Sequence, residues 1–346
     1  MKPSFRRGKK WFMDTMPSLR LSAKEHSIAH TTIYNVPQGR LGNAAFRYLA
    51  SIVFLYLRGT DGEFVYQRRA IKHSCTITDN CFLEIMNIIH DKNMDAAMAN
   101  IRSKYRGSNY VFHGYFQHDE IYKKFKTHIL RHIEMHPEEL LMSDNNTTQK
   151  VIDLLHHPNP EKTKDIICRM RTYDLVLHVR LEDFIRTGQA IDPRCIKRVV
   201  QQFLSATATS APAETSAVKK IHHGCRRQSS PPFEPNICVV VNELTTELER
   251  KYVNYIFEEL TTQYVIETND IITDYHIMKN AKVLMCSCST ISWMAALLSD
   301  VAEHVYFPNY PHTRIHETFR KPIDNTTYYD IELCDEAKLL QILSNT

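Results

Sequence analysis

The chain has 346 residues, of which 43% are hydrophobic and 24% are charged, and its formal net charge is +4. This length and apolar content suit two domains with a core each, and the small positive charge does not favour a nucleic-acid-binding protein, whose lysines and arginines gather along one face. No stretch reaches the roughly 18 to 20 apolar residues of a membrane span. The first residues, MKPSFRRGKKWFM, lack the apolar core of a secretion signal. We therefore expect a soluble chain without a membrane span.

The first half contains one clear strand-turn-helix unit. Thr31–Val36 has the β-branched composition of a strand, and Ala44–Arg58 places apolar side chains on one face of a helix. Between them lies the glycine-bounded turn GRLGN at Gly39–Asn43, whose backbone can pass close to a ligand and which presents Arg40 and Asn43 at the start of the helix. A simple tight turn with a solvated arginine is the alternative interpretation.

The second half alternates strand and helix patterns. Strands are expected at Tyr173–Arg180, Ile237–Val241, Gln263–Glu267, Lys282–Ser287 and His304–Phe307. Helices are expected from Pro193 to about Leu204, from a Thr245 cap to about Leu260, and at Asp274–Ala281 and Ile291–Ser299. Alternation of this kind predicts a mostly parallel sheet with helices on both faces.

Ligands on such sheets bind beyond the carboxyl ends of the strands. Polar residues lie at the ends of three of the predicted strands: His178 and Arg180, then Asn242 and Glu243, then Ser287 and Ser289. Arg180 is the first choice for a diphosphate, because its guanidinium fork pairs two oxygens at once and keeps its charge. His178 shares a face of the strand with Arg180, and we expect His178 to support the structure of the site rather than to contact the ligand.

The third of these strand ends leads directly into a helix, at Cys288, Ser289 and Thr290. The first N–H groups of a helix have no intrahelical partners and carry the positive end of its dipole. A strand, a small-residue loop and a helix therefore form a seat for a phosphate group. Trp293 and Met294, further along this helix, are expected to pack in the core.

Four segments, in this order, resemble the α1,2-fucosyltransferase family: GRLGN followed by an aromatic helix, GYFQ at 114–117, LHVRLEDF at 177–184 and SCSTISWMAALLS at 287–299. The resemblance implies a GT-B type α/β fold, with two Rossmann-like domains facing each other across a cleft. It implies inverting, metal-independent transfer of fucose from GDP-fucose to a glycan hydroxyl. The donor-site residues that it implies are Arg180 on the diphosphate, Arg40, Gly42 and Asn43 from the other domain, and Ser289, Thr290 and Ser292 in the phosphate-side motif.

An inverting transfer needs a base within hydrogen-bond reach of the acceptor hydroxyl. The candidates are His113, Asp119, Glu182 and Asp183, and His113 and Asp183 are counted with Arg180 as the catalytic set. Asp183 has an alternative role, which is to hold Arg180 in place.

Two other functions stay open. Leu181 and Glu182 stand where the family commonly has arginine and glycine, and this departure favours as one alternative a transferase with another donor, such as a xylosyl donor. The unassigned base motivates the other alternative, a non-catalytic protein that binds a nucleotide sugar.

The expected domains are a flexible arm (1–28), an acceptor-side Rossmann-like domain (29–150), a nucleotide-sugar-binding Rossmann-like domain (151–312) with a mobile insertion (205–235), and a tail with a closing helix (313–346). No cofactor or metal is expected, and the expected partners are a GDP-sugar donor and a glycan acceptor. The nine cysteines are expected to be reduced. For the sequence as given, the expected location is the cytoplasm. Because animal members of the family are usually anchored in the Golgi, the Golgi lumen is expected if the sequence is a truncated form.

Overall fold

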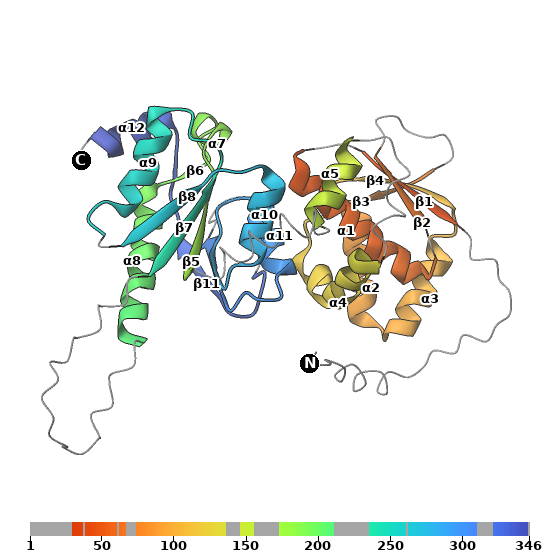
Figure 1. Ribbon diagram of the computed structural model, residues 1–346. Coiled ribbons are helices and arrows are strands. Elements are labelled where there is room, and N and C mark those ends of the chain that lie inside the picture. The colour runs from red at the N-terminus through yellow and green to blue at the C-terminus, as the bar shows by residue number, and fades with distance from the viewer. Residues whose placement is uncertain are drawn as a thin grey trace, which may run out of the picture.

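The structure is a computed structural model that describes residues 30–36, 39–60, 62–66, 74–135, 146–155, 173–210, 235–260, 262–309 and 321–344. It contains two α/β units, each built around a parallel sheet (Figure 1). The expected arm and residues 211–234 of the expected insertion lie outside the described residues, whereas residues 205–210 belong to a helix.

The first unit has a four-stranded parallel sheet with the order β2-β1-β4-β3. Its strands are β1 (Thr31–Asn35), β2 (Gly62–Tyr66), β3 (Cys75–Thr78) and β4 (Asn109–His113), and its helices are α1 (Leu41–Arg58), α2 (Asp79–Asp91), α3 (Met94–Lys104), α4 (Asp119–Met135) and α5 (Asn146–Leu155). Helix α1 begins three residues earlier than predicted, because Leu41, Gly42 and Asn43 form its first turn. It is buried over most of its surface, so it is the central helix of this unit.

The second unit has a six-stranded parallel sheet with the order β11-β10-β9-β5-β7-β8. Its strands are β5 (Leu175–Val179), β7 (Asn236–Val241), β8 (Gln263–Glu267), β9 (Val283–Met285), β10 (His304–Asn309) and β11 (Thr326–Asp330). Taken from β8 across to β11, the strands follow the order 3-2-1-4-5-6 of a Rossmann fold. The direction of winding therefore changes between β5 and β9.

Helices cover both faces of this sheet, as predicted. They are α7 (Asp183–Arg186), α8 (Pro193–Ser210), α9 (Glu247–Phe257), α10 (Ile271–Lys279), α11 (Thr290–Leu298) and α12 (Glu336–Ser344), and a two-stranded antiparallel pair, β6 (Ala190–Ile191) and β12 (Leu333–Cys334), lies beside them. Alternate residues of β5 enter different cores: Val176 packs with α10 and α11, while Leu175 and Leu177 pack with α8 and α9. This alternation is what a sheet buried on both faces requires.

Further expectations differ from the structure: helix α10 begins at Ile271, three residues before the expected Asp274. Thr246, not Thr245, caps α9: its hydroxyl accepts from the Glu249 N–H at 3.2 Å, and the Glu249 carboxylate accepts from the Thr246 N–H at 2.8 Å, which completes a capping box. The described part of the expected tail, residues 321–344, belongs to the second unit, because β11 pairs with β10 and α12 packs on α9. The boundary expected at residue 150 falls within α5.

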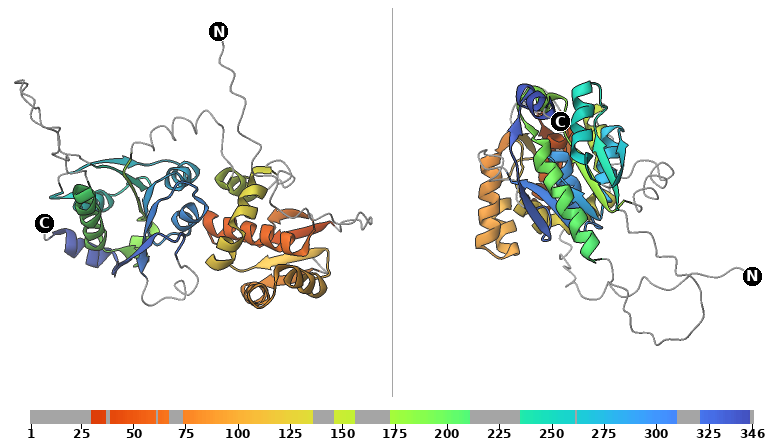
Figure 2. Two further views of the ribbon diagram at one scale, coloured as in Figure 1. Left: turned by 90° about the horizontal axis from the view of Figure 1, so that it is seen from below. Right: turned by 90° about the vertical axis from the view of Figure 1, so that its left-hand side faces the viewer.

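The two units share one apolar core. Helices α10 and α11 of the second unit pack against α1, α4 and α5 of the first, as Figures 1 and 2 show. The rings of Phe46 and Trp293 meet across this boundary with their centroids 5.4 Å apart, and both are fully buried. Because relative motion of domains becomes restricted when their interface is apolar and continuous, we expect the units to keep this arrangement.

Within the described ranges, every helix is too short or too polar to cross a membrane. The seven cysteines in those ranges, at positions 75, 81, 195, 238, 286, 288 and 334, are all unbridged.

Candidate functional site

Helices α1 and α11 begin at the same place, one from each unit. A Cβ atom added to Gly42, in the first turn of α1, would collide with the Thr290 hydroxyl and lie 3.1 Å from the Thr290 Cβ. Neither N-cap residue, Arg40 or Ser289, supplies a capping side chain, and neither first turn contains an acidic residue. The positive ends of two helix dipoles therefore converge, and an anion placed between them is stabilised.

A cavity of about 510 Å³ lies at this junction and is lined by both units. It contains seven of the residues that the sequence singled out: Arg40, Gly42, Asn43, Arg180, Asp183, Ser289 and Thr290. In the second unit the cavity lies beyond the carboxyl ends of β5 and β9, where the winding of the sheet changes direction. That is the place where open α/β sheets bind ligands. Two parallel α/β units with a cavity between them have the predicted GT-B arrangement.

Two arginines from different units meet at one carboxylate in this cavity. Arg180 Nη2 lies 3.3 Å from Asp183 Oδ1, and Arg40 forms an ion pair with Asp183 Oδ2. The Arg180 side chain is only 13% exposed, while that of Arg40 is 54% exposed. Asp183 therefore bridges the two rims of the cavity, and the more exposed Arg40 is the arginine that is freer to change partner.

Further contacts fix the direction of Arg180. Its Nη1 donates to Asn242 Oδ1 at 3.3 Å, its Nη2 lies 3.4 Å from Glu182 Oε2, and its guanidinium carbon lies 5.7 Å from the centre of the Phe184 ring. Asp183 thus pairs with Arg180, as expected for its alternative role, and both residues line the cavity. Glu182 has a φ angle of 37°, in the left-handed region that favours glycine.

Four predicted residues do not line the cavity but lie behind those that do: His178, Asn242, Ser287 and Ser292. Ser287 Oγ is 2.8 Å from His178 Nδ1, which joins β5 to the end of β9. Burial lowers the pKa of His178 to about 4, so its ring is neutral at physiological pH. Ser292 Oγ donates to the carbonyl oxygen of Ser289 at 3.1 Å and so holds the loop before α11.

Of the four candidate bases, only Asp183 lines the cavity. His113 lies at the exposed end of β4, outside the lining. Asp119 is buried in the first turn of α4, where burial raises its pKa and Lys123 Nζ lies 3.2 Å from its Oδ2. Glu182 also lies outside the lining. The structure thus does not bring His113 together with Arg180 and Asp183, contrary to the expected catalytic set.

Several lining residues were missed by the sequence reasoning. Tyr115, Gln117 and Phe184 lie within the motif segments, so their positions carried a signal, although no role was assigned to them. Gln189, Ile271, Phe307 and Leu333 come from four separate places in the second unit and carry no local pattern. Trp293 also borders the cavity, but it is fully buried and packs in the core as expected.

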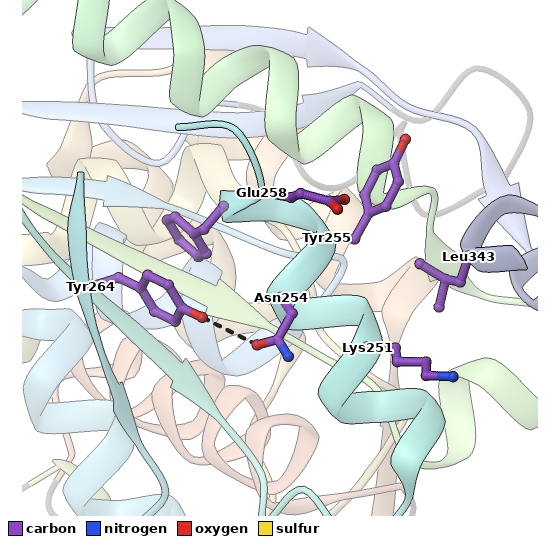
Figure 3. A pocket seen from close by; sticks show the side chains of 7 residues that line it. Lys251, Asn254, Tyr255, Glu258, Tyr264 and Leu343 are labelled. Atoms are coloured by element: carbon purple, nitrogen blue, oxygen red, sulfur yellow. Dashed lines mark hydrogen bonds between the residues drawn. The ribbon is translucent and has the colours of Figure 1, made fainter. Parts of the chain in front are cut away.

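A second hollow, of about 550 Å³, lies on the second unit among α9, β8 and α12 (Figure 3). Tyr264 Oη donates to Asn254 Oδ1 there at 3.1 Å, and the Tyr264 ring stacks on Phe257. Among the described residues that line it, Lys251 is the one cation and Glu258 the one anion. Because this hollow lacks both the strand ends and the helix N-termini, we place the functional site in the cavity between the units.

Among the described residues, no group of three or more His, Cys, Asp or Glu side chains is placed to hold a metal ion.

No family model matches the chain, and no curated protein matches it in sequence. The structure is similar to that of a mutant of Arabidopsis thaliana FUT1 in complex with GDP, with a TM-score of 0.42 and 9% identity over 84% of this chain and 73% of that chain. It is similar to E. coli heptosyltransferase WaaC with ADP (TM-score 0.39, 7% identity, 91% and 99% of the two chains). It is also similar to POFUT1 in complex with GDP-fucose (TM-score 0.40, 10% identity, 80% and 98%). Because these scores are low, the fold assignment rests on the strand order and pairing of this chain.

Proposed function

We propose that this protein is a glycosyltransferase that holds the diphosphate of a nucleotide sugar between its two α/β units. One observation carries the proposal: Arg40 and Arg180, from different units, meet in the cavity where the N-termini of α1 and α11 converge. Two guanidinium groups and two helix dipoles together suit a ligand with more than one negative charge. The diphosphate takes the place of Asp183 as the partner of Arg40.

The proposed donor is GDP-fucose, and the proposed reaction is inverting and independent of a metal. This finer assignment is supported by the four motif segments, all of which supply residues to the cavity. Apolar side chains from the second unit, Phe184, Ile271, Phe307 and Leu333, provide the surface that a nucleoside and a deoxy sugar require. The altered positions Leu181 and Glu182 keep another nucleotide-sugar donor, such as a xylosyl donor, as the alternative.

The chemistry follows from the charges around the cavity. The bond between the anomeric carbon and the diphosphate oxygen breaks, and its electron pair leaves with the diphosphate. Arg180 and the helix N-termini stabilise that departing charge, and because they are already in place they cost little reorganisation. The acceptor oxygen attacks from the opposite face and gives its proton to a base.

A second candidate function, a nucleotide-sugar-binding protein without catalysis, is favoured by one observation. Asp183 is the only expected base that lines the cavity, and it already accepts from two guanidinium groups. That arrangement suits an orienting role for Asp183 better than proton transfer.

A donor panel separates these functions. GDP-fucose, UDP-xylose and ADP-heptose are incubated with the protein, and release of the nucleoside diphosphate is followed with and without a mixture of glycan acceptors. We expect release from GDP-fucose that rises with acceptor, and we expect Arg180→Ala to lower turnover by about 2 to 4 kcal/mol of transition-state stabilisation. Arg186→Ala is the matched control, because Arg186 is exposed on α7 and does not line the cavity.

The outcomes are distinct. Binding of GDP-fucose without release in any acceptor mixture favours the non-catalytic protein. Preference for the UDP- or ADP-sugar removes fucose as the donor. Failure of GDP, UDP and ADP alike to bind removes the proposed function.

A further inference from the structure

The turn between β4 and α4, Gly114–Gln117, has an unusual backbone. Gly114 has a φ angle of 158°, and Phe116, which is not glycine, has a φ angle of 53°. A side chain in the left-handed region costs on the order of 1 kcal/mol, and such a conformation persists only where the surroundings determine it. This turn follows the carboxyl end of β4, which is the neighbour of β1 in the sheet, so it lies next to the Gly39–Asn43 turn.

The partly exposed carboxylate of Asp79 holds the turn. Asp79 Oδ2 accepts from the Tyr115 N–H at 3.1 Å, and its Oδ1 accepts from the Phe116 N–H at 2.6 Å. Burial alone raises the pKa of Asp79, but the hydrogen bonds from His118, Phe116 and Tyr115 outweigh this effect and the pKa is lowered. A Cβ atom at residue 114 would lie 2.8 Å from the Asp79 carboxyl carbon, so glycine is required there for this close approach.

Three other polar groups of the turn also form hydrogen bonds. Arg47 Nη1 donates to the Gly114 carbonyl oxygen at 3.3 Å, and the Tyr122 hydroxyl donates to the carbonyl oxygen of Phe116. Gln117 Nε2 donates to Asn43 Oδ1 at 2.8 Å, which ties the turn to the first turn of α1.

One side chain of this turn is left exposed. Phe116 is fully buried and stacks on Phe112 at 5.1 Å, whereas Tyr115 is 49% exposed and lines the cavity. The five hydrogen bonds of the turn and the buried Phe116 therefore hold Tyr115 at the cavity. Tyr115 is the aromatic residue that the first unit supplies to the lining, and Arg180 of the second unit lines the same cavity.

We propose that Tyr115 is the surface on which a pyranose ring of the glycan acceptor stacks. This proposal rests on the proposed function, because it takes the anionic donor to lie at the arginines and the helix N-termini. A pyranose ring has an apolar face of C–H groups that packs against an aromatic ring, while the tyrosine hydroxyl stays available to the sugar hydroxyls. A tyrosine held by a rigid backbone loses little conformational freedom on binding, so it is well suited to a weak, neutral ligand.

The test uses defined sugars and three variants. The probes are the methyl pyranosides of glucose, galactose, N-acetylglucosamine and xylose, and their binding is measured by saturation-transfer-difference NMR with and without GDP. Nucleotide affinity is measured by calorimetry on the same samples. The variants are Tyr115→Ala, Tyr115→Phe and Tyr115→Trp, and Tyr328→Ala is the control, because Tyr328 is similarly exposed at 41% and lies outside the cavity.

We expect at least one pyranoside to bind the unaltered protein, and Tyr115→Ala to weaken that binding roughly tenfold, as loss of an aromatic contact does. Tyr115→Phe and Tyr115→Trp retain the binding, and GDP affinity is unchanged in all three variants. Thermal unfolding of each variant is the folding control, and we expect all of them to share the midpoint of the unaltered protein.

Three results would overturn the proposal: no pyranoside signal from the unaltered protein, equal binding by Tyr115→Ala, or a loss of GDP affinity in Tyr115→Ala, which assigns the ring to the donor. If GDP does not bind the unaltered protein, the proposed function fails. The pyranoside titrations without GDP then still decide the role of Tyr115.

Discussion

Gly42→Ala tests the meeting of the two helix N-termini. In an ordinary helix, replacing glycine by alanine stabilises by about 1 kcal/mol, because alanine loses less backbone entropy. At Gly42 the new methyl group meets the Thr290 hydroxyl and lies 3.1 Å from the Thr290 Cβ and 3.3 Å from the Ile291 Cδ1. Thr290 is β-branched and begins α11, so its side chain has little freedom to move aside.

The sign of the stability change in Gly42→Ala therefore shows whether Gly42 contacts Thr290 or faces open space. Overpacking of this kind costs about 1 to 3 kcal/mol. Set against the helix propensity, the expected result is a net loss of roughly 1 kcal/mol in the free energy of unfolding, together with weaker binding of GDP, because Gly42 lines the cavity.

The assay is urea unfolding of four proteins: unaltered, Gly42→Ala, Thr290→Ala and the double variant. Removal of the Thr290 hydroxyl relieves the closest contact, so the double variant is expected to be more stable than the sum of the single effects by about 1 kcal/mol. An increase in stability for Gly42→Ala, or strict additivity of the two changes, would refute the close approach of α1 and α11.

Two further variants test the support of the cavity. His178 is neutral because burial lowers its pKa to about 4. Between pH 6.5 and 4 the histidine of the unfolded chain, with a pKa near 6.5, therefore takes up a proton that the folded one does not. The contribution of His178 to the free energy of unfolding is fully present above pH 6.5 and falls by about 3 kcal/mol as the pH drops towards 4. Urea unfolding across this range should show that His178→Asn, which keeps a polar partner for Ser287, lacks this share of the decline, and an unchanged pH profile would contradict the assignment. Glu182 has a φ angle of 37°, so Glu182→Gly should raise the free energy of unfolding by roughly 0.5 to 1 kcal/mol despite the loss of the half-exposed pair with Arg180, and a decrease of that size would show that the backbone is not strained.

The second unit was largely predictable from the sequence, because its buried strands are continuous β-branched runs such as NICVVV at Asn236–Val241. In the first unit, the strand β1 and the helix α1 were predicted, but the other elements were not. Strands such as Asn109–His113 are short and mix aromatic with polar residues, so they resemble loops. Helix α2 did carry a signal: Thr78 caps it, and Phe82, Ile85, Met86 and Ile89 face the core at helical spacing.

The candidate site was predictable where one segment supplies both the position and the chemistry. Arg180 follows a buried strand, and Ser289 and Thr290 open a helix, so their place at the edge of the sheet follows from local pattern. The ion pair between Arg40 and Asp183 was not predictable, because it depends on how two units pack. The position of His113 was not predictable either. It lies at the carboxyl end of β4, where a site residue is expected, but it does not line the cavity.

The most direct test of the account is calorimetric titration of GDP into the unaltered protein and into Arg40→Ala, Arg180→Ala and Arg186→Ala. A diphosphate held by both arginines predicts that the first two variants each bind GDP roughly 10- to 100-fold more weakly, as loss of a charge-assisted hydrogen bond does, while Arg186→Ala binds as the unaltered protein does. Equal affinity in all four proteins would contradict a diphosphate site between the two units.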